Sequence, residues 1–280
     1  MKPEFHHHTA LITGASSGIG AAVAHALAAR GASLVLVARR AMELKRVERE
    51  IRSSASESTA EIHCIPADVT AAMDRQRIRD FLEQKQLPLH ILINNAGITS
   101  HARFDETQSD VLRRTMEINF FAAVELTAQM LPLLKKSARP TGGRKSIVLV
   151  STPSGLYGIP GRFAYSASKA AGHVWMEAMR QELKADQIQC NIICPGYTRT
   201  ALRQSGLDGQ GNTIQEEQAK EAKSPHYMAV QIINGIIKNK RLLLTDTNGR
   251  FVYWLRTLAP GLLERIMAKK LAKDLRGSVE

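Results

Sequence analysis

Short apolar segments alternate with longer segments of helical periodicity along most of this chain. Strands that are apolar along their whole length are buried on both faces, and a helix is the usual connection between parallel strands. The alternation therefore predicts an α/β fold in which helices cover both faces of a parallel sheet. The predicted strands are 8–14, 33–39, 61–69, 89–97, 145–152, 188–196 and 241–246, and the predicted helices are 20–31, 41–54, 71–86, 107–136 and 163–183.

The chain has 280 residues, which suits one large α/β domain. We find neither an internal repeat nor a linker, so we predict a single doubly wound domain over residues 1–250. A polar, glycine-bearing stretch at about 201–225 is the predicted substrate lid. Residues 251–280 form a basic, amphipathic C-terminal extension.

The charge of the chain narrows the classes of partner that it can bind. The net charge is +12, and residues 238–280 carry +6 of it, from ten basic and four acidic residues. This balance favours an anionic ligand or a membrane surface. We expect no nucleic acid, because no helix-turn-helix, finger or aromatic stacking strip is present.

The remaining bulk features favour a cytoplasmic protein. The three cysteines form no paired framework, and no apolar run reaches the roughly 18–20 residues of a membrane span. The first predicted strand begins too early to leave room for a signal peptide. We read His6, His7 and His8 as a solvated leader and predict no metal site.

A glycine-rich turn, Thr13-Gly14-Ala15-Ser16-Ser17-Gly18-Ile19-Gly20, joins the first predicted strand to the first predicted helix. Glycines at this place let the backbone approach a pyrophosphate, and the helix N-terminus offers free N–H groups and partial positive charge. The turn therefore indicates a Rossmann-type dinucleotide site. Its spacing, G-x-x-x-G-x-G, differs from G-x-G-x-x-G.

Two further motifs follow in order. Asn94-Asn95-Ala96-Gly97 comes after the fourth predicted strand, and Tyr165-x-x-x-Lys169 comes after the fifth. Together the three motifs, over roughly residues 8–250, resemble the short-chain dehydrogenase/reductase family. The resemblance implies an oxidoreductase in which Tyr165 and Lys169 form the catalytic pair and Asn119 holds a proton-relaying water. Alternatively, Asn119 caps or stabilises a break in its helix.

The chemistry of this pair explains its residue types. A carbonyl reductase must deliver a proton to the carbonyl oxygen, and a tyrosine of ordinary pKa, about 10, is a poor acid–base near neutral pH. On a helix Lys169 lies one turn from Tyr165, where its ammonium group would stabilise the phenolate and lower that pKa.

The sequence departs from the family at one catalytic position. The family usually has a serine thirteen residues before the tyrosine, and this chain has Thr152 there. Threonine keeps a hydroxyl that can hydrogen-bond the carbonyl, so we assign that role to Thr152. Ser151 and Ser154 are the alternatives.

Cofactor choice depends on the end of the second predicted strand. The family position for an acidic, NAD-selecting residue is Ala38, which Arg39 and Arg40 follow. An arginine suits a dianionic 2′-phosphate, so we expect NADP(H), although two solvated arginines would look the same. By the resemblance, Asp68 contacts adenine unless it only caps a turn. The predicted cofactor-binding residues are Gly14, Ser16, Ser17, Gly18, Ile19, Gly20, Arg39, Arg40, Asp68, Val69, Asn95, Ala96, Gly97, Tyr165, Lys169, Pro195, Gly196, Thr198 and Thr200.

The C-terminal extension carries an apolar stripe with basic residues between its members. Such a stripe usually packs on its own protein or on a second subunit, and we expect packing here. A basic amphipathic helix is also typical of an interfacial membrane anchor. The extension is similar to the C-terminus of the family's dehydrogenase/reductase 7B-like branch. This resemblance implies an association with membranes and the reduction of lipid-type carbonyls. The stripe consists of Trp254, Leu255, Leu258, Leu262, Leu263, Ile266, Met267 and Leu271.

These features support two functions. The first is an NADPH-dependent oxidoreductase that interconverts a ketone or aldehyde and an alcohol on a lipophilic small molecule. The second is an NADPH-binding sensor or scaffold that docks on a membrane or partner through its basic extension and turns over little. We expect a homodimer or homotetramer.

Overall fold

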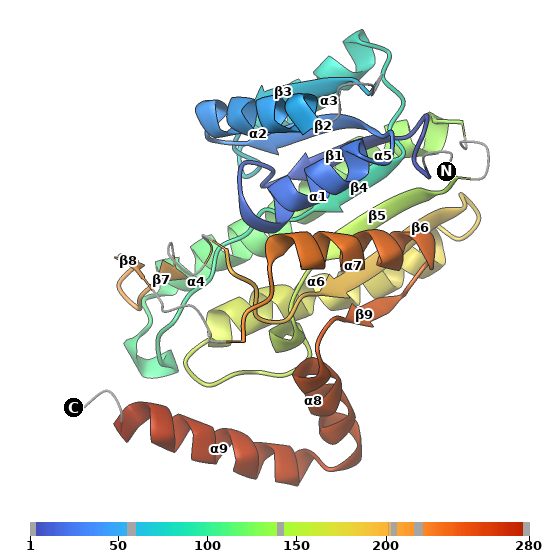
Figure 1. The fold of residues 1–280 in the computed structure, drawn as a ribbon. Helices are drawn as coiled ribbons and strands as arrows, with labels where there is room; N and C mark the ends of the chain where they lie inside the picture. Colours follow the sequence, from blue (N-terminus) through green and yellow to red (C-terminus); the bar gives the residue numbers. More distant parts are fainter. Residues whose placement is uncertain are drawn as a thin grey trace.

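The computed structural model describes residues 4–54, 60–138, 143–200, 202, 206–215 and 221–276. Its main element is a parallel sheet of seven strands in the order β3-β2-β1-β4-β5-β6-β9 (Figure 1). The strands are β1 (Thr9–Thr13), β2 (Ser33–Ala38), β3 (Ile62–Pro66), β4 (Ile91–Asn94), β5 (Lys145–Val150), β6 (Ile188–Cys194) and β9 (Leu242–Leu244). This architecture confirms the predicted α/β, doubly wound fold.

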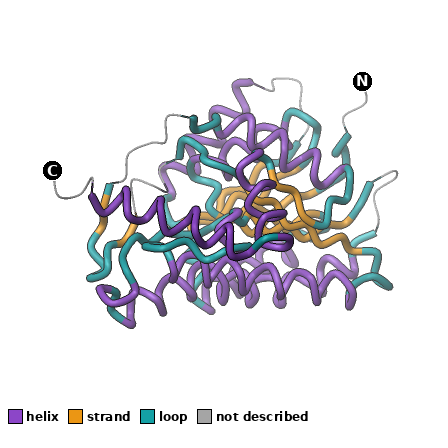
Figure 2. The backbone as a smooth tube through the Cα atoms, turned by 90° about the horizontal axis from the view of Figure 1, so that it is seen from below, coloured by secondary structure: helices purple, strands orange, loops and turns teal. Residues whose placement is uncertain are grey.

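Helices cover both faces of the sheet (Figure 2). One core lies between the sheet and α1, α2 and α7, and a second core lies between the sheet and α3, α5 and α6. The helices are α1 (Gly18–Ala28), α2 (Ala41–Ser54), α3 (Ala72–Gln84), α4 (Ser109–Met116), α5 (Ala122–Lys136), α6 (Phe163–Glu182), α7 (Pro225–Ile237), α8 (Thr247–Leu258) and α9 (Pro260–Arg276). A small antiparallel pair, β7 (Gly206–Leu207) and β8 (Thr213–Ile214), lies within the predicted lid.

The sequence analysis missed α7, although its start carries clear signals. Ser224 is the N-cap, its side chain accepts a hydrogen bond from the backbone N–H of Tyr227, and Pro225 occupies the first turn. The helix then buries Met228 and Ile232, among others, against the sheet. A Ser-Pro step before an apolar helical pattern would have found it.

The long helix predicted over 107–136 is present over residues 109–136, but it contains a widened turn that the periodicity does not predict. The structure has α4, then a wide turn with i→i+5 geometry at Glu117–Phe121, then α5. Asn119 lies in this turn and is buried. Its side chain bonds the backbone of Ile98 in another loop, and a tertiary contact of this kind leaves no periodic signal in the sequence.

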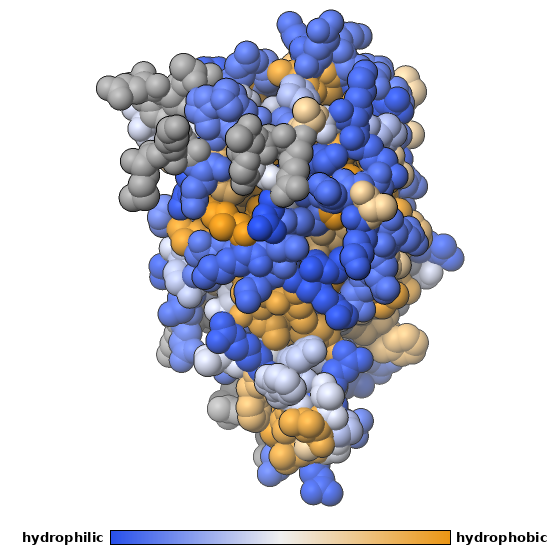
Figure 3. All heavy atoms as spheres, turned by 90° about the vertical axis from the view of Figure 1, so that its right-hand side faces the viewer, coloured by the Kyte–Doolittle hydropathy of each residue, from blue (hydrophilic) through white to orange (hydrophobic). Residues whose placement is uncertain are grey.

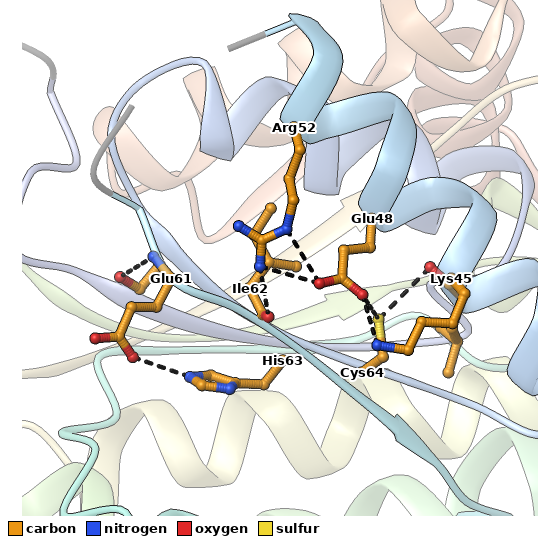
Figure 4. Close-up of polar contacts among 9 residues, drawn as sticks. Lys45, Glu48, Arg52, Glu61, Ile62, His63 and Cys64 are labelled. Carbon is orange, nitrogen blue, oxygen red and sulfur yellow. Dashed lines mark hydrogen bonds and ion pairs between the residues drawn. The ribbon is translucent and has the colours of Figure 1, made fainter. Parts of the chain in front are cut away.

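Polar contacts join the sheet-edge strand β3 to α2 (Figure 4). Glu48 accepts hydrogen bonds from Lys45 and Arg52, and Arg52 also donates to the Ile62 carbonyl. The Cys64 thiol lies beside Glu48, and burial raises the pKa of Cys64 to about 11. Cys64, like the buried Cys190 and Cys194, is a free thiol, as predicted.

The N-terminal segment is not wholly a solvated leader. His6 and His7 are exposed, but His8 and Phe5 are buried. The ring of His8 packs edge-on against that of His90, with 5.6 Å between the ring centroids. The interpretation of this segment as a leader is therefore wrong for His8.

The buried His90 is expected to make the folded state less stable in acid. Its Nδ1 accepts the backbone N–H of Thr9, a bond that protonation would remove. Burial first, and then repulsion from His8, lowers the pKa of His90 to about 4. The unfolded chain titrates near pH 6.5, so it binds more protons than the folded chain between pH 4 and 6.5. The free energy of unfolding therefore falls as the pH drops through this window, by on the order of 3 kcal/mol for this group.

His90→Asn isolates this contribution, because the asparagine oxygen can accept the same N–H bond without titrating. We expect the difference in unfolding free energy between parent and variant to change by about 3 kcal/mol between pH 7 and pH 4. Urea titrations across this range measure it. A difference independent of pH would show that His90 does not control acid stability.

Candidate functional site

Two adjoining cavities lie at the carboxyl ends of the parallel strands, where α/β sheets usually bind ligands. The first, the glycine-turn cavity, has a volume of about 450 Å³ and is lined by the turn after β1 and the ends of β2 and β3. The second, the tyrosine cavity, has a volume of about 540 Å³ and contains Tyr165 and Lys169. The two share a wall formed by Ile19, Asn95, Gly97, Ile98, Thr200 and Leu202.

The glycine-rich turn exposes its backbone to the glycine-turn cavity. Gly14 has φ +64°, and a methyl group there would lie 2.9 Å from the Asn95 side chain. Ser17, the N-cap of α1, makes no side-chain capping bond, and the first turn of α1 has no acidic residue. The helix N-terminus therefore keeps N–H donors and positive potential for an anionic ligand, as a dinucleotide pyrophosphate would require.

Most of the predicted cofactor-binding residues meet in this cavity. Gly20 does not line it; a side chain there would collide with the carbonyl of Gly14, so Gly20 serves the packing of the turn. The predicted residues that do line it are Gly14, Ser16, Ser17, Gly18, Ile19, Arg39, Arg40, Asp68, Val69, Asn95, Ala96, Gly97 and Thr200.

Two arginines stand at the far end of the first cavity. Arg40 donates to the hydroxyls of Ser16 and Ser17, at 3.1 and 3.0 Å, and so lies over the glycine-rich turn. Arg39 lines the same cavity near Asp68. Ala38, in the cavity wall between β2 and these arginines, brings no acidic group.

Asp68 has a structural role as well as a place in the cavity. Its carboxylate accepts the backbone N–H and the hydroxyl of Thr70, which closes the turn before α3. Burial opposes ionisation, but the bonds from Thr70 and the charge of Arg39 outweigh it, so the pKa of Asp68 is lowered. Asp68 therefore caps the turn, as the alternative interpretation predicted, and also lines the glycine-turn cavity.

The loop after β4 forms the floor between the cavities. The Thr13 hydroxyl accepts the backbone N–H groups of Asn95 and Ala96, at 2.9 and 3.0 Å. The Asn95 amide in turn donates to the carbonyls of Thr13 and Gly14. These bonds tie the ends of β1 and β4 together, so the Asn-Ala-Gly motif holds the glycine-rich turn in place.

Tyr165 and Lys169 lie one turn apart on α6 and face the same cavity. Lys169 is 5% exposed, and its Nζ donates to the carbonyl of Val150 at the end of β5, at 3.2 Å. Burial lowers the pKa of Lys169 to about 8. A group with this pKa keeps its positive charge at neutral pH, where it can stabilise a phenolate.

Asn119 lies behind this cavity and does not line it. Its Oδ1 accepts the backbone N–H of Ile98, and its Nδ2 donates to the Ile98 carbonyl and the Ser168 hydroxyl. A methyl group at Gly97 would lie 2.9 Å from Oδ1 of Asn119 and 3.4 Å from Nζ of Lys169. Asn119 thus lies in the π-helical turn between α4 and α5, where its side chain stabilises the irregularity as the structural alternative predicted, and close to Lys169.

Three hydroxyls follow β5, and all three line the tyrosine cavity. The Ser151 hydroxyl is hydrogen-bonded to His173 at 2.6 Å. Thr152 accepts the backbone N–H of Ser154 at 3.3 Å and caps the short turn Pro153–Gly155. The structure thus brings all three candidates for a carbonyl-aligning hydroxyl to the same cavity.

The loop after β6 closes the cavity on a third side. The predicted residues Pro195, Gly196, Thr198 and Thr200 all line the tyrosine cavity. Thr200 also lines the glycine-turn cavity, so this loop spans both sites. Parts of the predicted lid, residues 201, 203–205 and 216–220, lie outside the described residues.

The sequence analysis missed the wall opposite Tyr165. It is built by α8 and α9, which stand below the sheet in Figure 1 and contribute residues to the lining of the tyrosine cavity. Periodicity had placed an apolar stripe here but could not show which surface it meets. The lining residues from this region are Asp246, Asn248, Gly249, Phe251, Val252, Leu263, Ile266 and Met267.

Two polar residues at the cavity wall were also missed, His101 and Arg162. The Arg162 guanidinium donates to the Thr99 hydroxyl at 3.0 Å. Both residues belong to loops, which carry no periodic signal. Within the described part of the chain, no group of three or more His, Cys, Asp and Glu is arranged to hold a metal.

Comparison with known proteins agrees with this geometry. A model of the short chain dehydrogenase family matches residues 8–210. The mouse protein named dehydrogenase/reductase SDR family member 7B is 33% identical over 267 residues, which cover 94% of this chain and 81% of the mouse chain.

Solved structures give the same picture. A short-chain dehydrogenase from Sphingobium yanoikuyae, in complex with NADPH, has a TM-score of 0.73 and 26% identity, over 92% of this chain and 95% of that one. A short chain dehydrogenase/reductase from Burkholderia phymatum, in complex with NAD, has a TM-score of 0.79 over 92% and 96% of the two chains; at 21% identity it shows the fold alone. This chain belongs to the short-chain dehydrogenase/reductase family, whose members are NAD(P)(H)-dependent oxidoreductases.

Proposed function

We propose that this protein is an NADPH-dependent reductase of a lipophilic ketone or aldehyde. The observation that carries the proposal is the composition of the tyrosine cavity. Tyr165 and Lys169 face an apolar wall in which Leu263, Ile266 and Met267 of α9 take part. Such a wall favours an apolar body on the substrate, with its carbonyl directed at Tyr165 and Lys169.

Tyr165 is the acid in this proposal. Its hydroxyl donates a proton to the carbonyl oxygen while the Lys169 ammonium group stabilises the phenolate left behind. The Thr152 hydroxyl aligns the carbonyl by donating a second hydrogen bond. Bound NADPH would supply the hydride. The cofactor would be held by the glycine-rich turn, Arg39 and Arg40. A water-relay role for Asn119 remains part of the proposal, supported by its nearness to Lys169.

The preference for NADPH rests on charge. Arg39 and Arg40 are the cavity-lining cations next to Ala38, the position that is acidic in NAD-selective members of the family. An arginine fork can donate two hydrogen bonds to a 2′-phosphate, whereas a carboxylate at Ala38 would repel it. The NADPH complex of the Sphingobium yanoikuyae relative adds support.

Ala38→Asp and Arg39→Ala should therefore weaken NADPH much more than NADH. The first adds a repelling charge, and the second removes a partner of the 2′-phosphate. We expect the ratio of NADH to NADPH dissociation constants to fall at least tenfold, as loss of one charge-assisted bond implies. Fluorescence titration with both cofactors measures the ratio. Arg49→Ala, on the exposed face of α2, is the control, and an unchanged ratio in all three variants would rule out our cofactor assignment.

The experiment that tests the function is a turnover screen. Purified protein and NADPH are mixed with ketones, aldehydes and quinones in series of increasing chain length, and loss of NADPH absorbance is followed. We expect kcat/KM to rise with chain length within a series. Tight NADPH binding without turnover on any compound would instead favour the sensor or scaffold alternative.

The outer surface of α8 and α9 supports a second element of the proposal, a peripheral membrane contact. Leu263 of the apolar stripe is buried on the protein itself, whereas Trp254, Leu258 and Leu262 are 60%, 75% and 51% exposed on the single chain. A second subunit or a membrane would have to cover these three side chains. Figure 3 shows hydrophobic side chains gathered at the end of the molecule that these helices form. No described helix is long and apolar enough to span a bilayer.

Exposed basic residues lie near these apolar residues in the sequence of both helices. Arg256, Arg265 and Lys269 are exposed on α8 and α9, with Glu264 as an exposed acidic neighbour. This composition fits the anionic leaflet of a cytoplasmic membrane, where apolar side chains insert and basic ones meet the head groups. A lipophilic substrate would then enter the tyrosine cavity from the membrane side.

The triple variant Arg256→Glu, Arg265→Glu and Lys269→Glu tests this contact without removing the cavity wall. Each basic residue near an anionic surface contributes about 1 kcal/mol, so binding to phosphatidylserine vesicles should weaken by on the order of 100-fold. Vesicle sedimentation measures it, and the melting temperature should stay unchanged. If the intact protein fails to sediment, or the variant sediments equally well, the extension does not contact lipid through these charges.

A further inference from the structure

Three buried polar side chains from three elements meet at the wall of the tyrosine cavity, which Ser151 lines and His173 and Cys194 do not. They are Ser151, just after β5, His173 on α6, and Cys194, the last residue of β6. The His173 Nε2 lies 2.6 Å from the Ser151 hydroxyl and 3.7 Å from the Cys194 sulfur. His173 and Ser151 are each 6% exposed and Cys194 is fully buried. Neither the catalytic pair nor the cofactor site accounts for this cluster.

His173 touches the segment that carries Thr152 at two points. Ser151 precedes Thr152, and its hydroxyl bonds the ring. Gly155 ends the short turn that Thr152 caps, and a methyl group on Gly155 would lie 2.9 Å from Nε2 of His173. The imidazole therefore fills the space beneath the turn and fixes both of its ends.

The same segment is also held by the catalytic lysine. Lys169 Nζ donates to the carbonyl of Val150, and His173 bonds the side chain of the next residue, Ser151. Lys169 and His173 are themselves one turn apart on α6. Two consecutive residues at the end of β5 are thus anchored to two successive turns of one helix, which sets the distance between α6 and the Thr152 turn.

A histidine here is costly to bury, since an imidazole loses its hydration and gains one strong hydrogen bond within the cluster. Burial first, and then the positive charge of Lys169, lowers the pKa of His173 to about 4, against a smaller opposing effect of Glu177. The ring is therefore neutral at physiological pH. A neutral ring can bond Ser151 without placing a second cation beside the lysine.

We infer that His173 is a positioning residue, which acts through the Ser151 hydroxyl to hold Thr152 in register with Tyr165 and Lys169. The inference rests on the proposed reductase function for its catalytic consequence. Neither His173 nor Ser151 lines the glycine-turn cavity, where the glycine-rich turn, Arg39 and Arg40 would hold the adenosine half of the cofactor, so we expect turnover to fall while cofactor affinity stays close to that of the parent.

A double-mutant cycle tests the inference. His173→Phe keeps the ring volume and removes the hydrogen bond, and Ser151→Ala removes the other partner. We expect each variant to lower kcat about tenfold at unchanged NADPH affinity, and the double variant to be no slower than the slower single variant, because both changes remove one interaction. His173→Gln, whose amide can bond the Ser151 hydroxyl, should recover most of the loss. Val174→Ala, an exposed neighbour on α6, is the matched control.

Three outcomes would overturn the inference. The first is a kcat for His173→Phe within twofold of the parent. The second is additive effects in the cycle, which would mean that the two residues act independently. The third is a slow Ser151→Ala with a normal His173→Phe, which would make Ser151 a direct substrate contact.

Hydrogen exchange separates this inference from the proposed function. Without any substrate, His173→Phe should speed exchange of the amides in the Thr152–Gly155 turn and leave those of the glycine-rich turn unchanged. This result would support positioning even if no tested compound were reduced, and unchanged exchange in the turn would contradict it. If His173→Phe fails to fold, the same comparison is made between His173→Gln and Ser151→Ala.

Discussion

Tyr165→Phe is expected to abolish reduction while leaving NADPH binding nearly intact. The substitution removes only the phenolic hydroxyl, and with it the proton that the carbonyl oxygen must receive. General acid catalysis of this kind contributes roughly 10²–10⁴-fold, so turnover should fall by at least that factor. The aromatic ring stays in the wall of the tyrosine cavity, and the glycine-turn cavity, which Tyr165 does not line, is untouched.

The measurement is kcat/KM for reduction beside the dissociation constant for NADPH. Tyr157→Phe is the matched control, since Tyr157 lines the same cavity but does not share the helical face of Lys169. A Tyr165→Phe variant that retains turnover within a few-fold of the parent would remove tyrosine from its proposed role. A collapse of NADPH affinity would show a structural defect instead of the loss of an acid.

Thr152→Ala should slow reduction by roughly 10–1,000-fold, the range for loss of one positioned hydrogen-bond donor at a reacting carbonyl. The same hydroxyl accepts the backbone N–H of Ser154, so its removal should also cost about 1 kcal/mol of local stability as a lost cap. Thr152→Ser keeps both bonds and should be close to the parent in rate and in melting temperature.

Ser154→Ala separates the two effects of Thr152. Ser154 lines the same cavity. Its substitution removes the 3.4 Å bond that the Thr152 hydroxyl donates to the Ser154 hydroxyl, but the bond from the Ser154 backbone N–H to Thr152 survives. We expect steady-state rates near those of the parent for Ser154→Ala. A crippled Ser154→Ala together with a normal Thr152→Ala would move the catalytic hydroxyl to Ser154 and show that counting thirteen residues back from the tyrosine misled us.

The sequence by itself determined the layered sheet, because burial on both faces requires strands that are apolar throughout, and this requirement is local. The glycine-rich turn and the Tyr-Lys pair were equally readable. The glycine spacing of the turn and two side chains one helical turn apart depend only on residues a few positions apart in the sequence. The positions of Arg39 and Arg40 at the end of β2 followed from the strand boundary alone.

Tertiary structure decided the features that join distant segments. The helix predicted over 107–136 widens to a π-helical turn at Asn119, whose amide bonds the backbone of Ile98, and His8 is buried where it packs on His90. The wall of α9 opposite Tyr165 and the bond between Ser151 and His173 also join elements far apart in the chain. An apolar stripe or a lone histidine shows which side chains need a partner, but only the arrangement of the whole sheet determines which partner lies within reach.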